Sequence, residues 1–241
     1  MIAAYVQCLV GLAAPLLGQA GAPLNVQQEQ RGASTAATSQ SILFVSDRDG
    51  DRDIYALDTA AASVSRALTH NSARDDFPVS SPDGSLIAYL SDARTPGGQA
   101  RVWVMGADGS QARQLCASPT GPMGEWSPSW SSDSAWLVFA RDDPDAAHGS
   151  GVWAVELRSG RETPVVPPVG SFIRSVQTSP AEDAVLFAQQ EDDGAWRSYV
   201  AWGDGSHIRN AGRGTDVRDG RWSTSSSTYA YAEQTAQALE L

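Results

Sequence analysis

The chain has 241 residues, a formal net charge of −11 and 41% hydrophobic residues. This apolar content is ordinary for a globular protein and excludes a largely disordered chain. The negative charge argues against nucleic acid and anionic lipid as partners, because both are bound by clusters of lysine and arginine.

The N-terminus has the features of an export signal. The first 22 residues contain no Lys, Arg, Asp or Glu, residues 6–17 are largely apolar, and Ala20-Gly21-Ala22 is a small-residue cleavage sequence. This pattern predicts that residues 1–22 are a secretory signal peptide and that the protein is periplasmic or secreted. An apolar N-terminal tail is the alternative, because no basic residue precedes the apolar stretch. That stretch is shorter than the roughly 20 residues of a spanning helix, so we expect no membrane insertion of the mature chain.

The rest of the chain divides into a tether and a folded domain. Residues 23–40 are rich in Gln, Ala, Ser and Thr and show almost no apolar periodicity, which predicts a disordered tether. Residues 41–241 form the predicted domain, in which Cys116 is the single cysteine. An internal disulfide is excluded there. We expect Cys116 to be a small buried strand residue, with an exposed thiol as the alternative.

One strand pattern recurs through this domain at a regular spacing. An apolar run with an aromatic residue occurs four times, with a weaker fifth copy, at residues 42–45, 86–89, 137–140, 185–188 and 229–232. The aligned residues Phe44, Tyr89, Phe139, Phe187 and Tyr231 are 45, 50, 48 and 44 residues apart. This period is typical of a propeller blade, a four-stranded sheet of about 40–50 residues.

Turns and further strands recur in phase with that run. A turn sequence precedes it, clearest as Ser81-Pro82-Asp83-Gly84, and a strand with a central aromatic residue follows it. The strands that follow are residues 54–57, 102–105, 152–155 and 198–201. Each repeat therefore reads as four strands, and no segment shows sustained helical periodicity. The predicted fold class is all-β: a β-propeller of four-stranded blades with about four full repeats and a partial one.

These motifs indicate a family resemblance. Residues 77–92, Phe-Pro-x-x-Ser-Pro-Asp-Gly-x-x-Ile-Ala-Tyr-x-Ser-Asp, followed by the strand 102–105 and by Arg113-Gln114-Leu115, are similar to the WD40-like repeat of the TolB family, the PD40 type. Residues 42–69 match the same pattern. The resemblance covers residues 41–235 and weakens toward the C-terminus. It implies a propeller fold, but the repeat serves binding proteins as well as the propeller domains of several peptidases.

The two ends of the repeat array are incomplete and complementary. Residues 41–69 lack an inner strand of their own, and residues 219–233 lack the two outer strands. The strand around Arg221-Trp222 would either complete the first blade and close a ring, or leave an incomplete propeller. We favour the incomplete propeller, whose open blades would allow self-association.

No set of residues in the sequence predicts catalysis. His70, His148 and His207 fall in different repeats, and the sequence contains no G-x-S-x-G nucleophile elbow. We therefore expect a protein that is not an enzyme and has no catalytic residue.

The loop from Asp47 to Asp53 is the strongest metal candidate. Alternate carboxylates around a glycine turn offer the oxygen ligands that Ca²⁺ prefers. The loop lacks the bidentate glutamate of an EF-hand, and the equivalent loops of later repeats are also acidic. Two interpretations stay open: a Ca²⁺ site at Asp47, Asp49, Asp51 and Asp53, or a solvated hairpin without a cofactor.

A second group of candidates lies in exposed loops that precede the inner strands of successive blades, and such loops gather at one mouth of a propeller. These residues are Arg74, Asp75, Asp76, Glu125, Trp126, Phe172 and Arg174. Aromatic and arginine residues at such a position suit a protein or peptide partner, with packing between blades as the alternative for each. We predict an exported, non-catalytic interaction or ligand-binding propeller. The alternatives are the propeller part of a peptidase-like or polysaccharide-lyase-like enzyme, and a truncated remnant.

Overall fold

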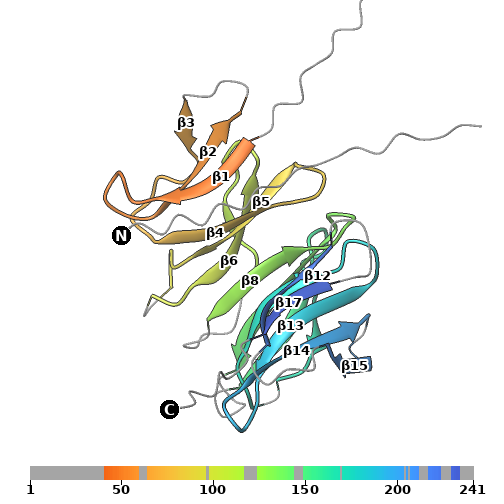
Figure 1. Cartoon of the computed structure of the whole chain (residues 1–241). Coiled ribbons are helices and arrows are strands. Elements are labelled where there is room, and N and C mark those ends of the chain that lie inside the picture. The colour runs from red at the N-terminus through yellow and green to blue at the C-terminus, as the bar shows by residue number, and fades with distance from the viewer. Residues whose placement is uncertain are drawn as a thin grey trace, which may run out of the picture.

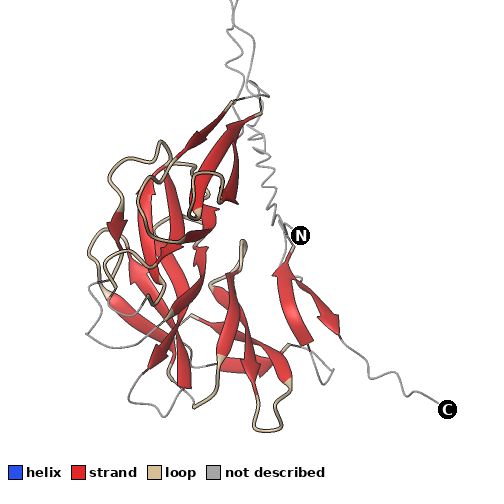
Figure 2. Ribbon diagram, turned by 90° about the vertical axis from the view of Figure 1, so that its left-hand side faces the viewer, coloured by secondary structure: helices blue, strands red, loops and turns tan. Residues whose placement is uncertain are grey.

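The chain folds into antiparallel sheets that follow one another along an open arc (Figure 1, Figure 2). This computed structural model describes residues 41–59, 64–95, 98–116, 124–143, 149–168, 170–203, 205, 207–211, 217–223 and 229–233. The predicted signal peptide and tether therefore lie outside the described residues. Within these ranges the chain forms strands and turns, and no helix that could span a membrane is found.

Five sheets, numbered 1 to 5 in chain order, contain the strands. Sheet 1 has β1 (Ser41–Ser46), β2 (Asp53–Asp58) and β3 (Ser65–Ala67). Sheet 2 has β4 (Asp75–Ser80), β5 (Leu86–Ser91), β6 (Arg101–Gly106) and β7 (Arg113–Gln114). Sheet 3 has β8 (Glu125–Trp130), β9 (Trp136–Asp143), β10 (Gly149–Glu156) and β11 (Glu162–Val166). Sheet 4 has β12 (Ile173–Thr178), β13 (Ala184–Gln190), β14 (Trp196–Trp202) and β15 (His207–Asn210). Sheet 5 has β16 (Val217–Trp222) and β17 (Tyr229–Glu233).

The order of strands confirms the predicted repeat. In sheets 2, 3 and 4 the four strands pair with their sequence neighbours, so each sheet is a meander that starts at the inner strand and ends at the outer one. In the part of the chain that the structure describes, sheet 1 has no inner strand and sheet 5 has two strands, as predicted. The sheets do not close into a ring, and the fold is an incomplete propeller.

The predicted turn between the first two strands of a blade is held by one aspartate. In sheet 2, Ser81 Oγ donates to Asp83 Oδ1 (2.6 Å), and the backbone amide two residues after Asp83 donates to the same oxygen (3.0 Å). In sheet 3, Ser131 and Asp133 repeat both bonds at the same distances. These hydrogen bonds hold the pKa of both aspartates below the usual value. The copy in sheet 3 lacks the proline and the glycine, so the Ser–Asp pair carries the turn.

Hydrogen bonds also join the inner strands of neighbouring sheets. The Trp130 indole N–H donates to the carbonyl of Val79 (2.9 Å), which ties β8 to β4. The Trp222 indole N–H donates to the carbonyl of Gln177 (3.2 Å), which ties β16 to β12. Between β8 and β12, the amide of Thr178 donates to a serine hydroxyl 3.0 Å away. The inner strands therefore fix the spacing between sheets by directional contacts.

The core consists of apolar clusters between adjacent sheets. Sheets 1 and 2 bury Ile54, Ala56, Leu68, Ile87, Tyr89, Trp103 and Met105 between them. Sheets 2 and 3 share a second cluster, sheets 3 and 4 a third, and sheets 4 and 5 a fourth that includes Trp222. Cys116 lies in the second cluster and is 2% exposed, which confirms the predicted burial. It follows β7 and does not lie in a strand, contrary to the second part of that prediction.

A cross-strand aromatic pair marks the face that each sheet turns toward the preceding sheet. Tyr89 lies opposite Trp103 in sheet 2, and Phe139 lies opposite Trp153 in sheet 3. The two tryptophans are therefore equivalent, as the repeat predicts. Trp103 is buried against sheet 1, whereas Trp153 packs on the sheet 2 cluster and stays partly exposed.

The corresponding pair in sheet 1 has a different environment. Phe44 stacks on Tyr55 with ring centroids 5.5 Å apart, and no described sheet precedes this face. The Arg48 guanidinium lies over both rings, 5.4 and 4.3 Å from their centroids. A cation thus covers aromatic surface that a neighbouring sheet covers elsewhere.

The far end of the array does not complete sheet 1. β16, which carries Arg221 and Trp222, pairs with β17 and packs on sheet 4. The ring-closing interpretation of this strand is therefore wrong, because its hydrogen bonds and its tryptophan are used at its own end of the arc.

The difference between the two aromatic positions gives a stability prediction. Phe139→Ala should lower the free energy of unfolding by about 3–5 kcal/mol, because the ring is fully buried between sheets. Phe44→Ala, at the aligned position, should lower it by only about 1–2 kcal/mol, because that ring is partly exposed. Urea unfolding of the parent protein and of both variants measures the two losses in free energy of unfolding. Equal losses would show that the open face of sheet 1 is covered in solution.

Candidate binding face

The candidate binding residues occupy equivalent positions in three consecutive sheets. Asp75, Glu125 and Ile173 are the first residues of β4, β8 and β12. The seven predicted residues fall at these positions or next to them, so they lie at the same end of sheets 2, 3 and 4. The burial of their side chains differs widely, and it separates residues that can meet a partner from residues that hold sheets together.

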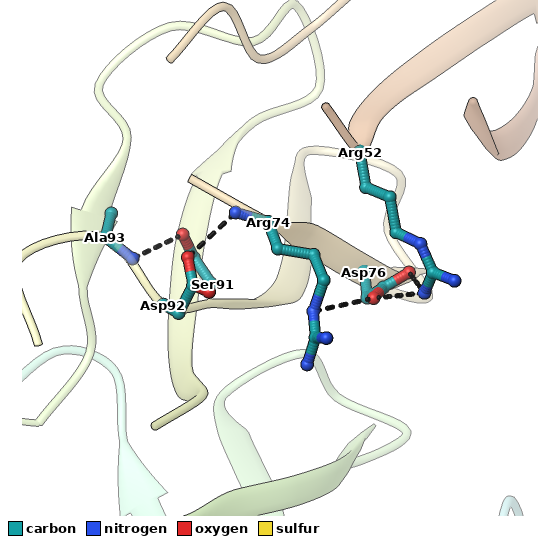
Figure 3. Close-up of polar contacts among 6 residues, drawn as sticks. All are labelled: Arg52, Arg74, Asp76, Ser91, Asp92 and Ala93. Carbon is teal, nitrogen blue, oxygen red and sulfur yellow. Dashed lines mark hydrogen bonds and ion pairs between the residues drawn. The ribbon is translucent and has the colours of Figure 1, made fainter. Parts of the chain in front are cut away.

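Arg74, which is exposed, and Asp76, which is largely buried, form a polar rim at the end of sheet 2 (Figure 3). The Arg52 guanidinium approaches both carboxylate oxygens of Asp76, at 2.9 and 3.2 Å, and Arg74 lies 3.6 Å from the same carboxylate. The backbone amide of Arg74 donates to Asp92 (2.8 Å). The Arg74 side chain is 60% exposed, so its guanidinium is accessible on this rim.

Glu125 is a structural residue. Its side chain is fully buried and receives the Arg141 guanidinium at 2.8 Å. Its other oxygen accepts the backbone amide of Val102, in the preceding sheet, at 2.7 Å. Arg141 also pairs with Glu162 of β11. Glu125 therefore joins sheets 2 and 3, and its carboxylate has no surface to offer to a partner.

Asp75 is also buried, with 0% exposure. The Asn71 amide donates to its Oδ2 atom (2.9 Å), and the hydroxyls of Ser91 and Thr69 lie beside it. Burial raises the pKa of Asp75 above its usual value, the surrounding hydrogen bonds lower it in part, and the nearby carboxylate of Asp53 raises it further.

The remaining predicted residues lie at the ends of sheets 3 and 4. Trp126 packs against the clusters on both sides of sheet 3 and is partly exposed. Phe172 is 48% exposed, and its carbonyl accepts the backbone amide of Gln190 (2.9 Å). The Arg174 guanidinium lies 3.5 Å from the ring centroid of Trp196. Phe172 and Arg174 thus place an aromatic ring and a cation at the surface.

Phe77 is a candidate that the sequence analysis did not select. It is 61% exposed and has a left-handed backbone (φ 54°), at a register shift between β4 and β5. The equivalent residues Ser127 and Ser175 have the same conformation, at the same shift in β8 and β12. This bulge is a repeated feature of the inner strands. Of these three sheets, only sheet 2 has a large apolar side chain at the bulge. The aligned repeats contain this difference, because they have Phe in one repeat and Ser in the next two.

The acidic loop of sheet 1 is a hairpin in which two carboxylates are already used. The Tyr55 hydroxyl donates to Asp49, and the Thr69 hydroxyl donates to Asp53 (2.9 Å), which is buried. The bond to Asp49 is the main cause that raises the pKa of Tyr55 to about 12. No group of three or more His, Cys, Asp or Glu within the described ranges is arranged to hold a metal. A Ca²⁺ site formed by these two with Asp47 and Asp51 stays a prediction from the sequence.

The two described histidines belong to different sheets. His70 follows sheet 1 and His207 begins β15 of sheet 4, and both are exposed. His148 lies outside the described residues.

The burial of Glu125 yields a direct test of its structural role. Glu125→Ala should lower the free energy of unfolding by about 3–5 kcal/mol, because it leaves a buried arginine with one partner fewer and the Val102 amide without an acceptor. Arg74→Ala, on the rim of the preceding sheet, is the matched control and should change the free energy of unfolding by no more than about 0.5 kcal/mol. Chemical denaturation measures both. A loss below about 1 kcal/mol for Glu125→Ala would contradict the assignment.

The raised pKa of Asp75 predicts a pH effect. A carboxyl group whose pKa is higher in the folded chain than in the unfolded chain contributes stability at low pH. That contribution is lost as pH rises from about 3.9, the ordinary value, through the folded-state pKa. Asp75→Asn should therefore gain stability relative to the parent protein as pH rises through this window. Unfolding free energies between pH 3.5 and 7.5, values chosen roughly to bracket the window, measure the difference. A difference that is independent of pH would contradict the prediction.

Comparison with known proteins supports the fold without assigning a function. No protein-family model matches the chain. An uncharacterized protein of Agrobacterium fabrum is 35% identical over 106 residues, which are 44% of this chain and 34% of that protein. The chain thus aligns with only about a third of the curated relative.

Solved structures resemble the chain over most of its length. A TolB protein of Agrobacterium tumefaciens matches with a TM-score of 0.66 and 17% identity, over 83% of this chain and 68% of that one. An oligogalacturonate lyase of Vibrio parahaemolyticus matches with a TM-score of 0.66 and 15% identity, over 79% and 55% of the two chains. A prolyl endopeptidase matches with a TM-score of 0.55 and 14% identity, over 73% and 28%.

These similarities concern architecture, because a fold shared at such low identity hosts many functions. A TolB protein, a lyase and a peptidase all match the same series of sheets. The chain has the β-propeller fold found in TolB, in an incomplete form with an open arc of sheets.

Proposed function

We propose that the chain is an exported, non-catalytic binding protein that contacts a protein or peptide through the mouth formed by sheets 2, 3 and 4. The observation that carries the proposal is the exposure of Phe77. Sixty-one per cent of this aromatic residue is exposed, on a backbone conformation that non-glycine residues rarely adopt. Ser127 and Ser175 show that the bulge needs no aromatic residue.

The surroundings of Phe77 fit a protein interface. Exposed aromatic and arginine side chains are the residues that contribute most to protein binding, and Arg74, Phe172 and Arg174 lie at the same end of the three sheets. The negative charge of the chain favours partners with basic or neutral surfaces. Export is inferred from the N-terminal sequence and places this interaction in the periplasm or outside the cell.

An enzymatic role is the second candidate, because a lyase and a peptidase have related propellers. Such a role would need a further catalytic group, since the described histidines are exposed and lie in different parts of the arc. Substrate turnover by the purified chain that is lost on replacing His70 or His207 would favour this candidate over the binding protein.

The binding proposal is tested by site-specific crosslinking in the native host. A photoreactive phenylalanine analogue at Phe77 should crosslink to a partner, and the product should be recovered from the periplasmic or culture fraction. The same analogue at Ile208, an exposed apolar residue on the outer strand β15, is the matched control and should not give this product.

A substitution separates binding from folding. Phe77→Ser introduces the residue of the next two sheets, so it should change the free energy of unfolding by no more than about 0.5 kcal/mol while abolishing co-purification of the crosslinked partner. Equal crosslinking from both positions, a product confined to the cytoplasm, or unchanged co-purification with Phe77→Ser would overturn the proposal.

A further inference from the structure

A cavity lies between sheets 1 and 2, and Phe77 is not among the residues that line it. Its volume is about 290 Å³, at the small end of the range for ligand pockets. The buried part of its lining comes from Leu68 and Thr69 after β3, Tyr89 and Ser91 on β5, and Trp103 on β6. Exposed residues, His70 and Arg94 among them, form its rim.

The repeat supplies an internal template for this space, because the same place between sheets 2 and 3 is filled. There the Arg141 guanidinium pairs with Glu125 at 2.8 Å and with Glu162. It also lies 5.1 Å from the ring centroids of both Phe139 and Trp153. One buried guanidinium thus satisfies two carboxylates and covers an aromatic pair.

Strand register shows which residues of sheet 2 correspond to the arginine and to the carboxylate that begins β8. Arg141 is two residues after the aromatic of its strand and lies opposite Glu125. Ser91 is two residues after Tyr89 and lies opposite Asp75. The arginine position is therefore occupied by serine, while the carboxylate is kept.

The second carboxylate of sheet 3, that of Glu162, also has no counterpart in sheet 2. Glu162 lies opposite Val155, two residues after the central tryptophan of β10. Arg113 lies opposite Val104, one residue after the central tryptophan of β6, so the residue that corresponds to Glu162 is Ala112. Ser91 and Ala112 both line the cavity. The cavity therefore lies where sheet 3 carries two long side chains and sheet 2 carries two short ones.

The carboxylate that remains lies directly behind the cavity wall. Asp75 is fully buried, and Thr69, Asn71 and Ser91, which surround it, all line the cavity. Its Oδ1 atom has no hydrogen-bond partner of normal geometry. The nearby carboxylate of Asp53 has the same sign and raises the pKa of Asp75. A buried carboxylate in this position is stabilised by a cation.

The aromatic part of the template is kept as well. Tyr89 and Trp103 are the counterparts of the ring pair beneath Arg141, and their centroids are 6.3 Å apart. The exposed Arg94 guanidinium lies 5.6 Å from the Trp103 centroid, at the rim, and makes no ion pair with Asp75 in the described chain. The inner part of the cavity therefore offers an aromatic wall, and the Asp75 carboxylate lies behind its lining.

One buried arginine of sheet 2 lies in the same row of strands. Arg101 is opposite Ser91 on β6 and is 5% exposed, but it is not among the residues that line the cavity.

From this correspondence we propose that the cavity between sheets 1 and 2 binds a guanidinium group from outside the chain. The group takes the place that Arg141 fills between sheets 2 and 3, with Asp75 as its counter-ion and Tyr89 and Trp103 as its aromatic wall. A planar guanidinium suits this site better than an ammonium, because it stacks on rings and hydrogen-bonds a carboxylate at once. The site needs no contact with Phe77, so it stands apart from the partner interaction proposed above.

The binding test uses methylguanidinium and methylurea, which have nearly the same shape and differ in charge. Calorimetric titration of the full chain should show saturable binding of methylguanidinium, and methylurea should bind about tenfold or more weakly. In nitrogen-15 NMR spectra, the indole N–H signal of Trp103, assigned with Trp103→Phe, should shift during the titration.

Three variants test the assigned roles. Asp75→Asn should weaken methylguanidinium binding by about tenfold or more. Ser91→Arg should abolish it, because the new side chain supplies the guanidinium that the next sheet has at this position. Ser91→Ala is the matched control and should bind as the parent protein does. Circular dichroism verifies the fold of each variant, and the comparison of the two probes on the parent protein needs no variant.

The source of the guanidinium is resolved by a third probe, the peptide Gly-Arg-Gly with blocked termini. Binding at least about tenfold tighter than methylguanidinium would assign the site to an arginine side chain of a partner, and equal binding would assign it to a small guanidinium compound. Either result supports the site. Absence of saturable binding by both guanidinium probes, equal binding of methylurea, or unchanged binding by folded Asp75→Asn or Ser91→Arg would overturn it.

Discussion

The structure depends on one requirement: a four-stranded sheet with apolar residues on both faces must have a neighbour on each side. Clusters between adjacent sheets meet this requirement, and the inner strands set the spacing through bonds such as that from the Trp130 indole to the carbonyl of Val79. Sheet 1 is the first sheet of the series, so among the described residues a neighbouring sheet covers only one of its faces. Arg48 lies over the aromatic pair on its other face.

The same scaffold position serves different purposes in successive blades. The first residue of the inner strand is a carboxylate with an arginine partner in sheet 3, a carboxylate beside a cavity in sheet 2, and the buried Ile173 in sheet 4. Repeats of one pattern therefore differ at places where the fold tolerates variation. Comparison of aligned positions within one chain identifies such differences, since the neighbouring blade shows what the scaffold itself requires.

Most of the architecture could be predicted from the sequence, because the signals are local. Apolar runs with a period near 45 to 50 residues and the Ser–Asp turns place the strands of sheets 1 to 4 within a few residues. The site was predicted less well. The seven candidate residues lie at or beside the first residues of the inner strands, but the burial of Asp75 and Glu125 could not be foreseen. It depends on partners far along the chain, such as Val102 in the preceding sheet.

Phe77 and the cavity are two further features that could not be predicted from the sequence alone. The exposure of Phe77 follows from a bulge whose left-handed backbone leaves no mark in the composition of the strand. The cavity follows from two small residues, Ser91 and Ala112, that come together from different strands. A serine or an alanine is ordinary at either position. Only the register between strands shows that both small residues lie at one place, where sheet 3 has Arg141 and Glu162.

The open arc also determines how the molecule should come apart. In a closed propeller every blade has two neighbours, and opening any one of them exposes two interfaces. Here sheet 1 and sheet 5 each have one neighbour in the described chain, so their detachment exposes a single interface. Local unfolding should therefore start at the two ends and proceed inward, with backbone amides of sheet 3 exchanging with solvent last. Because the cavity lies between sheets 1 and 2, a ligand bound there would oppose the separation of these two sheets and slow local unfolding at the N-terminal end of the arc.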